Sequence, residues 1–167
     1  MSHVRNPIHK ACFSLMYACG LRVTEAATLP VSAIDSANRL IKVMGKGKKE
    51  RLVPLPQPMI ESLRALWRTH RNPRWLFPNF RNTGPLDRTT LCRTFWEVAK
   101  EANIGTATSH SLRHSYATRL LEQKVQPRVV QILLGHSHLS TTAKYQHLTE
   151  PTKASLRSVL DKLMTGL

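Results

Sequence analysis

The chain has 167 residues, enough for one domain with a hydrophobic core. Hydrophobic residues make up 41% and charged residues 21%, and no apolar run is long enough to suggest a membrane span. The charge is unusual, because 25 lysines and arginines oppose 10 acidic residues, a formal +15. Such a charge predicts a nucleic-acid partner, since neutralised phosphates release counterions. An anionic membrane surface is the alternative, but no basic amphipathic helix supports it.

The amino terminus and the cysteines indicate a cytoplasmic protein. The opening sequence, MSHVRNPIHKACF, has a broken apolar stretch and no cleavage pattern, so it is not a signal peptide. Three cysteines, Cys12, Cys19 and Cys92, stand among apolar neighbours, which predicts buried thiols in a reducing compartment. The pair His136 and His138 has no accompanying CxxC motif, so we expect no zinc site.

The amino-terminal part predicts two helices joined by a tight turn. Asn6 and Pro7 begin the first helix as a cap and a first-turn proline, and Gly20 ends it in a left-handed conformation. A short second helix follows, with Arg22 at the turn between the two. Arg22 is therefore either a functional side chain with little freedom or an ordinary surface arginine paired with Glu25.

The next stretch predicts an antiparallel hairpin with a basic tip. Residues 39–43 and 50–55 are strand-like, and the segment GKGKK, residues 45–49, joins them. Glycine lets a backbone turn with positive φ and approach a phosphate closely. A lysine of this tip is either a solvated charge or a proton donor in a DNA groove. The tip is not a P-loop, because the GxxxxGK[ST] spacing is absent.

Apolar residues at helical spacing predict a core helix from Pro58 to about Thr69 and another helix from about Asp87. Residues 75–78 form a short buried anchor, and residues 80–86 form the most loop-like stretch. Residues 150–167 predict a final helix, which can close the core of its own domain or dock on a neighbouring molecule. Its apolar side consists of Leu156, Val159, Leu160, Leu163, Met164 and Leu167. The fold class expected is mainly α with a small antiparallel β-sheet, in a single domain over residues 1–167.

The stretch from Ser109 to Tyr145 carries the side chains best suited to chemistry. Ser109 is expected to cap a helix on which His110 and Arg113 share a face, while His114 lies one position round and can face the protein.

A further helix begins at Pro127 and ends at Gly135, which presents His136 just beyond the helix. Ser140 is expected to cap a short helix that holds Tyr145. Taken singly, His136 could simply cap a helix end, and Tyr145 could be a partly buried aromatic residue.

Together, these side chains suit an attack on a phosphodiester. A basic pair and a second histidine can grip the phosphate, and a phenol oxygen can act as the nucleophile. No acidic cluster suited to Mg²⁺ is apparent, so the side chains must stabilise the charge themselves, and we expect no metal and no cofactor.

Four segments in this order resemble the tyrosine recombinase (phage integrase) family, in its Xer-like branch. They are YACGLRVTEAATL, KVMGKGKKERLVPL, HSLRHSYATRLLE and LLGHSHLSTTAKYQHL, and the resemblance covers most of the chain from Ala11 to Leu148. The resemblance implies the catalytic-domain fold of this family. It also implies DNA strand cleavage and rejoining, in site-specific recombination or DNA integration, through a 3′-phosphotyrosyl intermediate.

The resemblance assigns the main chemical roles. Arg22 and Arg113 match the two family arginines that bind the non-bridging oxygens of the scissile phosphate. Tyr145 matches the nucleophile, whose phenol has an ordinary pKa of ~10 and needs help to lose its proton. His110 matches the general base. Lys46 matches the lysine that gives a proton to the departing 5′-oxygen.

Further positions follow from the same resemblance. His136 matches a residue that hydrogen-bonds the phosphate, and Glu25 and His114 match accessory positions that orient their neighbours. The basic residues of the hairpin, Lys48, Lys49 and Arg51, are expected to bind DNA. The implied partners are double-stranded DNA and other copies of the chain, in a synaptic tetramer formed through the C-terminal helix; no membrane is expected.

Relatives carry an amino-terminal helical domain that clamps the other face of the DNA, and this sequence is expected to lack it. The chain is then a fragment, a decayed mobile-element gene or a stand-alone catalytic domain. The alternative function is a DNA-binding module of a mobile element without turnover, and a type IB topoisomerase is the alternative within the enzyme class.

Overall fold

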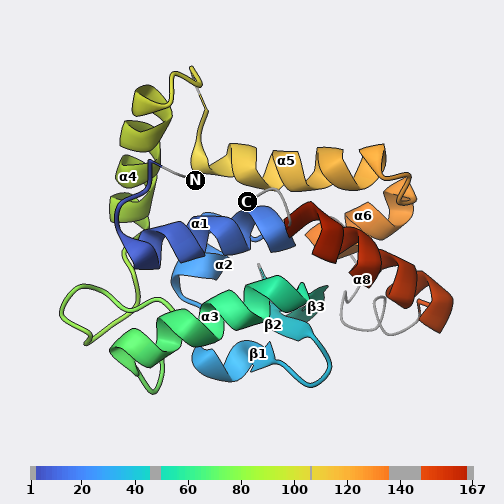
Figure 1. Ribbon diagram of the computed structural model, residues 1–167, viewed down its shortest axis with the longest axis horizontal. Helices are drawn as coiled ribbons and strands as arrows, with labels where there is room; N and C mark the ends of the chain where they lie inside the picture. The colour runs from blue at the N-terminus through green and yellow to red at the C-terminus, as the bar shows by residue number, and fades with distance from the viewer. Residues whose placement is uncertain (1–2, 46–49, 106, 136–147, 165–167) are drawn as a thin grey trace.

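The computed structural model describes residues 3–45, 50–105, 107–135 and 148–164 (Figure 1). The helices are α1 (Pro7–Cys19), α2 (Val23–Ala27), the 3-10 helix η1 (Val31–Ala33), α3 (Gln57–His70), α4 (Arg88–Glu101), α5 (Ser109–Glu122), α6 (Pro127–Leu134) and α8 (Glu150–Met164). The strands are β1 (Ile34–Asp35), β2 (Leu40–Met44) and β3 (Glu50–Pro54). The expected fold class, mainly helical with a small antiparallel sheet, is confirmed.

Local signals set most of the helix ends. Asn6 Oδ1 accepts hydrogen bonds from the backbone N–H groups of Ile8 and His9, at 2.9 and 3.2 Å, and so caps α1. The prediction that Ser109 caps α5 is wrong by one residue. Thr108 is the cap because its backbone is extended, with φ −119° and ψ 169°, whereas Ser109 is already helical.

The three strands form an antiparallel sheet in the order β1-β2-β3. The hairpin was predicted to within one residue at each end, with Ile41 opposite Val53 and Val43 opposite Arg51. Strand β1 was not predicted, since two residues are too short to show an alternating pattern. One face of the sheet, with Ile41, Val43 and Val53, packs into the core around α1, and Leu52 on the other face packs against the core of α5, α6 and α8.

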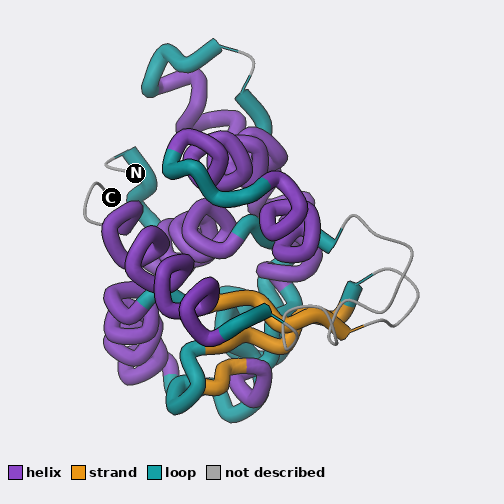
Figure 2. Tube along the Cα trace, turned by 90° about the vertical axis from the view of Figure 1, so that its right-hand side faces the viewer, coloured by secondary structure: helices purple, strands orange, loops and turns teal. Residues whose placement is uncertain are grey.

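Helix α1 is central, because it contacts α2, α3, α5 and α8. Figure 1 shows α5 running alongside α1, and Figure 2 shows the sheet along one edge of the helical body. The hydrophobic core consists of one buried cluster around α1 and a second cluster of α5, α6 and α8. Within the part of the chain that the structure describes, no helix is both long and apolar enough to cross a membrane.

The described part of the C-terminal helix, α8, packs on its own domain, which was one of the two expectations for it. Leu156 and Leu160 are buried in the second cluster. Asp161 accepts two hydrogen bonds from Arg39 Nη2, at 2.5 and 2.7 Å, and one from the backbone N–H of Gln57 at 2.9 Å. The helix is therefore joined to the sheet and to the start of α3 by polar contacts as well as by apolar burial.

Candidate active site

Arg113 lies at the point where α5 meets the ends of two other helices. The residue is only 8% exposed. Nη1 donates to the carbonyl oxygen of Gly20 at 2.6 Å, and Nη2 donates to the carbonyl oxygen of Leu134. These carbonyls belong to the C-terminal ends of α1 and α6, where unpaired carbonyls carry partial negative charge. Arg113 thus satisfies two helix ends and is held in one position by them.

Both of these helices end at a glycine in the left-handed conformation, as predicted. Gly20 has φ 62° and Gly135 has φ 68°. A Cβ atom at Gly20 would lie 2.5 Å from Cδ1 of Tyr116, a fully buried ring one turn beyond Arg113. The absence of a side chain at Gly20 therefore lets α5 approach the end of α1 closely enough for the Arg113 contact.

Glu25 organises the second half of the site. Its Oε1 accepts from Nη1 of Arg22 at 2.8 Å and from Nη1 of Arg51 at 2.7 Å. Its Oε2 accepts from the backbone N–H of Arg22 at 2.8 Å and from Nη2 of Arg51 at 2.7 Å. The side chains of Glu25 and Arg51 are 5% and 3% exposed, whereas that of Arg22 is 37% exposed. Arg22 thus combines the two expectations for it. It pairs with Glu25, which limits its freedom, and its side chain still reaches solvent, where it can bind a ligand.

The electrostatics of the site follow from these contacts. Burial alone would raise the pKa of Glu25, but the hydrogen bonds and charge of Arg51, followed by the bonds from Arg22, lower it to about 2. Burial, followed by the positive charges of Arg22 and Arg51, lowers the pKa of Arg113 to about 10. Two guanidinium groups therefore share the carboxylate of Glu25, and a third, that of Arg113, is bonded to neutral carbonyls. The three arginines outweigh the one carboxylate, so the site is positive, as an anion-binding site requires.

The two histidines of α5 are both exposed. His110 lies in the first turn of the helix, three residues before Arg113. His114 was expected to be able to face the protein, and that expectation is wrong, because His114 is exposed. Lys46, Lys48, Lys49, His136 and Tyr145 lie outside the described residues.

Arg51 was predicted to bind DNA, and its burial corrects that prediction. Both terminal nitrogens are bonded to Glu25, and the side chain does not reach the surface. The sequence held a signal for this placement, because alternation along the strand puts Arg51 on the same face as the buried Val53. The carbonyl partners of Arg113 had no such signal, since Gly20 and Leu134 come from distant parts of the chain.

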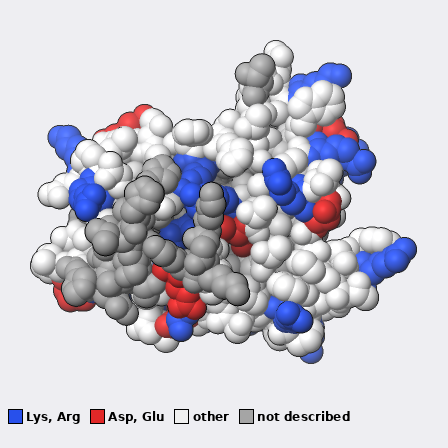
Figure 3. Space-filling model, turned by 180° about the vertical axis from the view of Figure 1, so that it is seen from behind, with Lys and Arg blue, Asp and Glu red and all other residues white. Residues whose placement is uncertain are grey.

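Lysine and arginine side chains gather at several places on the face opposite to that of Figure 1, with acidic side chains between them (Figure 3).

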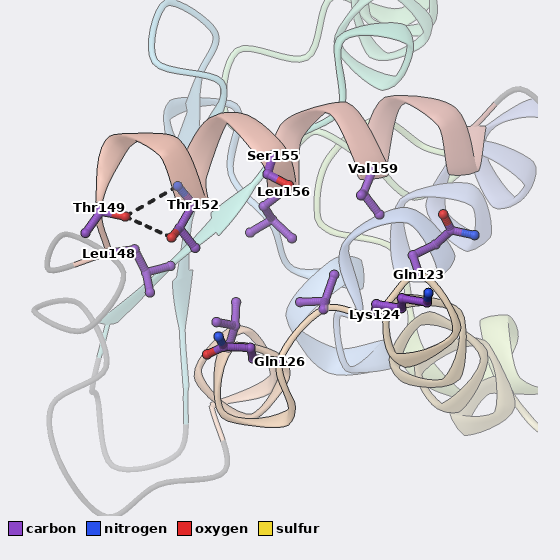
Figure 4. Close-up of a pocket in the computed structure, with 11 residues that line it drawn as sticks. Gln123, Lys124, Gln126, Leu148, Thr149, Thr152, Ser155, Leu156 and Val159 are labelled. Carbon is purple, nitrogen blue, oxygen red and sulfur yellow. Dashed lines mark hydrogen bonds between the residues drawn. The ribbon is translucent and has the colours of Figure 1, made fainter.

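A cavity of about 330 Å³ lies elsewhere, between the turn after α5 and the start of α8. Figure 4 shows Gln123, Lys124 and Gln126 on one side and Leu156 and Val159 on the other. None of the described residues with a predicted chemical role lines this cavity. The candidate active site is therefore placed at the arginine cluster near the end of α1, which consists of Arg22, Arg51 and Arg113.

The Phage integrase family model matches residues 3–151. The chain therefore belongs to the phage integrase family. Tyrosine recombinase XerD of Rhizobium meliloti (strain 1021) is 41% identical over 146 residues, which cover 84% of this chain and 47% of the relative. The chain thus spans about half the length of the curated relatives that it matches.

Solved structures agree with this assignment. The XerH site-specific recombinase, solved in a post-cleavage complex with palindromic difH substrate, matches with a TM-score of 0.71 and 26% identity. That match covers 95% of this chain and 46% of the XerH chain. The lambda integrase catalytic core shares the fold, with a TM-score of 0.64 and 22% identity over 81% of this chain and 83% of that chain. The expected catalytic-domain fold is confirmed.

Proposed function

We propose that the chain is the catalytic domain of a tyrosine-type site-specific DNA recombinase or integrase, which cleaves and rejoins double-stranded DNA through a 3′-phosphotyrosyl intermediate. One observation carries the proposal: Arg22 and Arg113 are held at the same place. Arg22 comes two residues after Gly20, which caps the end of α1, and Arg113 donates to the carbonyl oxygen of Gly20. Two fixed guanidinium groups suit the charge that builds on a phosphate during transesterification.

In the proposed reaction, the phenol oxygen of Tyr145 attacks the phosphorus while the bond to the 5′-oxygen breaks. His110 takes the phenol proton, and Lys46 gives a proton to the departing 5′-oxygen, so that a free 5′-hydroxyl forms. Arg22 and Arg113 bind the non-bridging oxygens throughout. Rejoining is the same reaction in reverse, with a hydroxyl from another strand as the attacking group, and it needs no cofactor.

The remaining residues have supporting roles in this proposal. His136, which follows Gly135 at the end of α6, hydrogen-bonds the phosphate. Glu25 orients Arg22 through its two hydrogen bonds, and His114 acts as an accessory residue on the exposed side of α5. Lys48 and Lys49 bind the DNA backbone from the hairpin tip.

We also propose that residues 1–167 act as one catalytic domain in the cytoplasm. Helix α1 contacts elements from both halves of the chain, which supports a single unit. The free, buried thiols of Cys12 and Cys19 are compatible with a reducing compartment.

Self-association on DNA, as a synaptic tetramer through the C-terminal helix, is a further part of the proposal. It is supported by the apolar side of α8, although Leu156 and Leu160 pack on their own domain here. An exchange of this helix between copies would have to release those leucines and the Asp161 contacts. Sedimentation of the chain on a duplex with two half-sites should show more than one copy per duplex, and a single copy at every concentration would contradict the tetramer.

Covalent capture tests the cleavage activity. The protein is incubated with supercoiled plasmid and with a panel of nicked duplexes, denatured in detergent, and examined for protein-linked DNA. We expect an adduct at the DNA 3′ end for the wild type and none for Tyr145→Phe. A matched control is Tyr17→Phe, which also removes one phenol oxygen and should keep the adduct.

The absence of an adduct on every substrate would count against the enzyme. The experiment would then be repeated with the chain joined to the part of a matched relative that lies outside the aligned region. If DNA still binds and no adduct forms, the alternative of a DNA-binding module without turnover replaces the proposal.

A further inference from the structure

Arg51 is a buried, charged residue that the reaction proposed above does not use. It lies on β3 opposite Val43, and its fork-shaped guanidinium group is bonded at both ends to Glu25. We propose that Arg51 is a positioning residue for DNA cleavage: it balances the charge of Glu25, so that this carboxylate can hold Arg22 without cancelling the charge that Arg22 offers to a phosphate. The inference rests on the proposed function.

Glu25 has two different relations to its two arginine partners: it holds Arg22 in place, and Arg51 balances its charge. An ionised carboxylate has about four acceptor sites, and here all four described bonds come from two arginines. Arg22 supplies one side-chain nitrogen and its backbone N–H, at 2.8 Å each, so both its backbone and its guanidinium group are fixed by Glu25. No described residue accepts a hydrogen bond from Nε or Nη2 of Arg22, and these atoms form the part of the fork that can bind an anion.

The charge argument requires a third partner. A pair made of Arg22 and Glu25 alone has a net charge of zero, so it would attract a phosphate weakly. Two guanidinium charges and one carboxylate charge leave the trio with one positive charge. Since Arg51 is 3% exposed and Arg22 is 37% exposed, the surplus charge is offered to solvent and to DNA through Arg22.

Arg51 is also held from its other side. Its Cδ lies 3.1 Å from the place that a Cβ atom would take at Gly135, so the stem of Arg51 passes against the end of α6. The preceding residue, Leu134, supplies one of the two carbonyls that hold Arg113. Arg51 therefore contacts the supports of both arginines of the site and lies between α2 and α6.

Substitutions that remove a charge, singly and in combination, test the proposal. Arg51→Met gives the trio a net charge of zero, and Glu25→Gln with Arg51→Met restores one positive charge. On the nicked duplex that the wild type captures best, we expect Arg51→Met to slow single-turnover adduct formation ~100-fold, while the DNA dissociation constant changes less than about threefold. The double variant should recover to within about tenfold of the wild type, although it removes more of the native contacts.

Arg51→Lys adds a second readout. It keeps the charge but loses the fork, and we expect a rate about tenfold below the wild type, well above that of Arg51→Met. A double variant as slow as Arg51→Met would overturn the proposal, because a residue with a packing role alone is not rescued by a change at Glu25. An equal loss of rate and DNA affinity would also overturn it, since it would place Arg51 in contact with DNA.

A measurement without DNA distinguishes this proposal from the proposed function. The pKa of Glu25 is followed by NMR of protein labelled at the glutamate carboxyl carbon. In Arg51→Lys it should stay near the wild-type value of about 2, and in Arg51→Met it should rise to its ordinary range or above. An unchanged pKa in Arg51→Met would refute the charge balance. A raised pKa in a protein whose wild type forms no adduct would instead refute the proposed function and, with it, the role in cleavage.

Discussion

Arg22 and Arg113 lie at the same end of α1 and are held by opposite means. Arg113 is buried and bonded to neutral carbonyls at Gly20 and Leu134, so it keeps its whole charge, and burial lowers its pKa. Arg22 is partly exposed and bonded to a carboxylate, whose charge must itself be offset by Arg51. A guanidinium group can therefore be fixed in place either by the carbonyls of helix ends or by an ion pair. Loss of the arginine should destabilise the fold more in the first case than in the second.

Replacing each arginine with alanine should show the largest difference between the two arrangements, in the free energy of unfolding. Arg113→Ala leaves two buried carbonyls without a donor, so we expect a loss of ~3 kcal/mol in the free energy of unfolding and a ~1000-fold slower cleavage. Arg22→Ala should slow cleavage to a similar extent with a loss of about 1 kcal/mol or less in stability. Urea unfolding and covalent capture measure the two quantities. DNA affinity should fall far less than the cleavage rate in both variants, and equal losses would argue against roles in the transition state.

The contact of Arg113 with the end of α1 depends on the close approach of α5 to Gly20. Gly20→Ala should cost ~3 kcal/mol or more, because the new Cβ would meet the ring of Tyr116 in addition to the strain of the left-handed backbone. Gly105→Ala is the matched control. It has φ 65° and nothing within 4 Å of the new Cβ, so it should cost only about 1 kcal/mol. Equal losses in thermal unfolding would show that backbone strain alone matters at Gly20.

The ion pairs of Glu25 should make the stability of the protein depend on pH in the acid range. The pKa of Glu25 is lowered to about 2 in the folded protein, from its ordinary value of 4.5. The carboxylate therefore contributes stability that is fully present above pH 4.5 and is lost as the pH falls towards 2, by roughly 2–3 kcal/mol. The difference in unfolding free energy between wild type and Glu25→Gln should shrink over this range. A difference that does not change with pH would contradict the lowered pKa.

The pair of Arg39 and Asp161 is a more exposed version of the Arg51 and Glu25 pair. The two side chains are 25% and 33% exposed, so solvent screens them. Asp161→Asn should therefore cost only about 1 kcal/mol in urea unfolding. The wide, exposed pair of Arg93 and Glu97, at 3.8 Å, gives a control, and Glu97→Gln should leave stability unchanged within error. A loss at Asp161 as large as that at Glu25 would remove burial as the explanation of the difference.

Local chemistry explains how much could be predicted from the sequence. The caps at Asn6, Gly20 and Gly135 depend on one residue and its immediate neighbours, and all three predictions are confirmed. Strand β1 has only two residues, so its sequence shows no strand pattern, and it forms because it pairs with β2. The misplaced cap at Ser109 has a similar cause, because Thr108 and Ser109 are both good capping residues and only the backbone separates them.

The candidate site was predictable in its residue types and less so in its contacts. The pairing of Arg22 with Glu25 is local, at a spacing of three residues, and it was anticipated. The bond from Arg51 to Glu25 joins residues 26 positions apart, and the bond from Arg113 to Gly20 joins residues 93 apart. Such contacts depend on how whole elements pack, which no short pattern in the chain records.

The bond between Arg51 and Glu25 depends on the register in which β2 and β3 pair. Arg51 reaches Glu25 only when it lies opposite Val43, on the face of the sheet that it shares with Val53. A slip of one residue between β2 and β3 would bring Glu50 or Leu52 to that place and turn Arg51 to the other face. A mispaired hairpin would then leave Glu25 without its partner, even if the helices were correctly packed. In the proposed reaction, a molecule with this hairpin mispaired would therefore cleave DNA slowly, as Arg51→Met is expected to do. The rate of cleavage would then report on the register of the two strands.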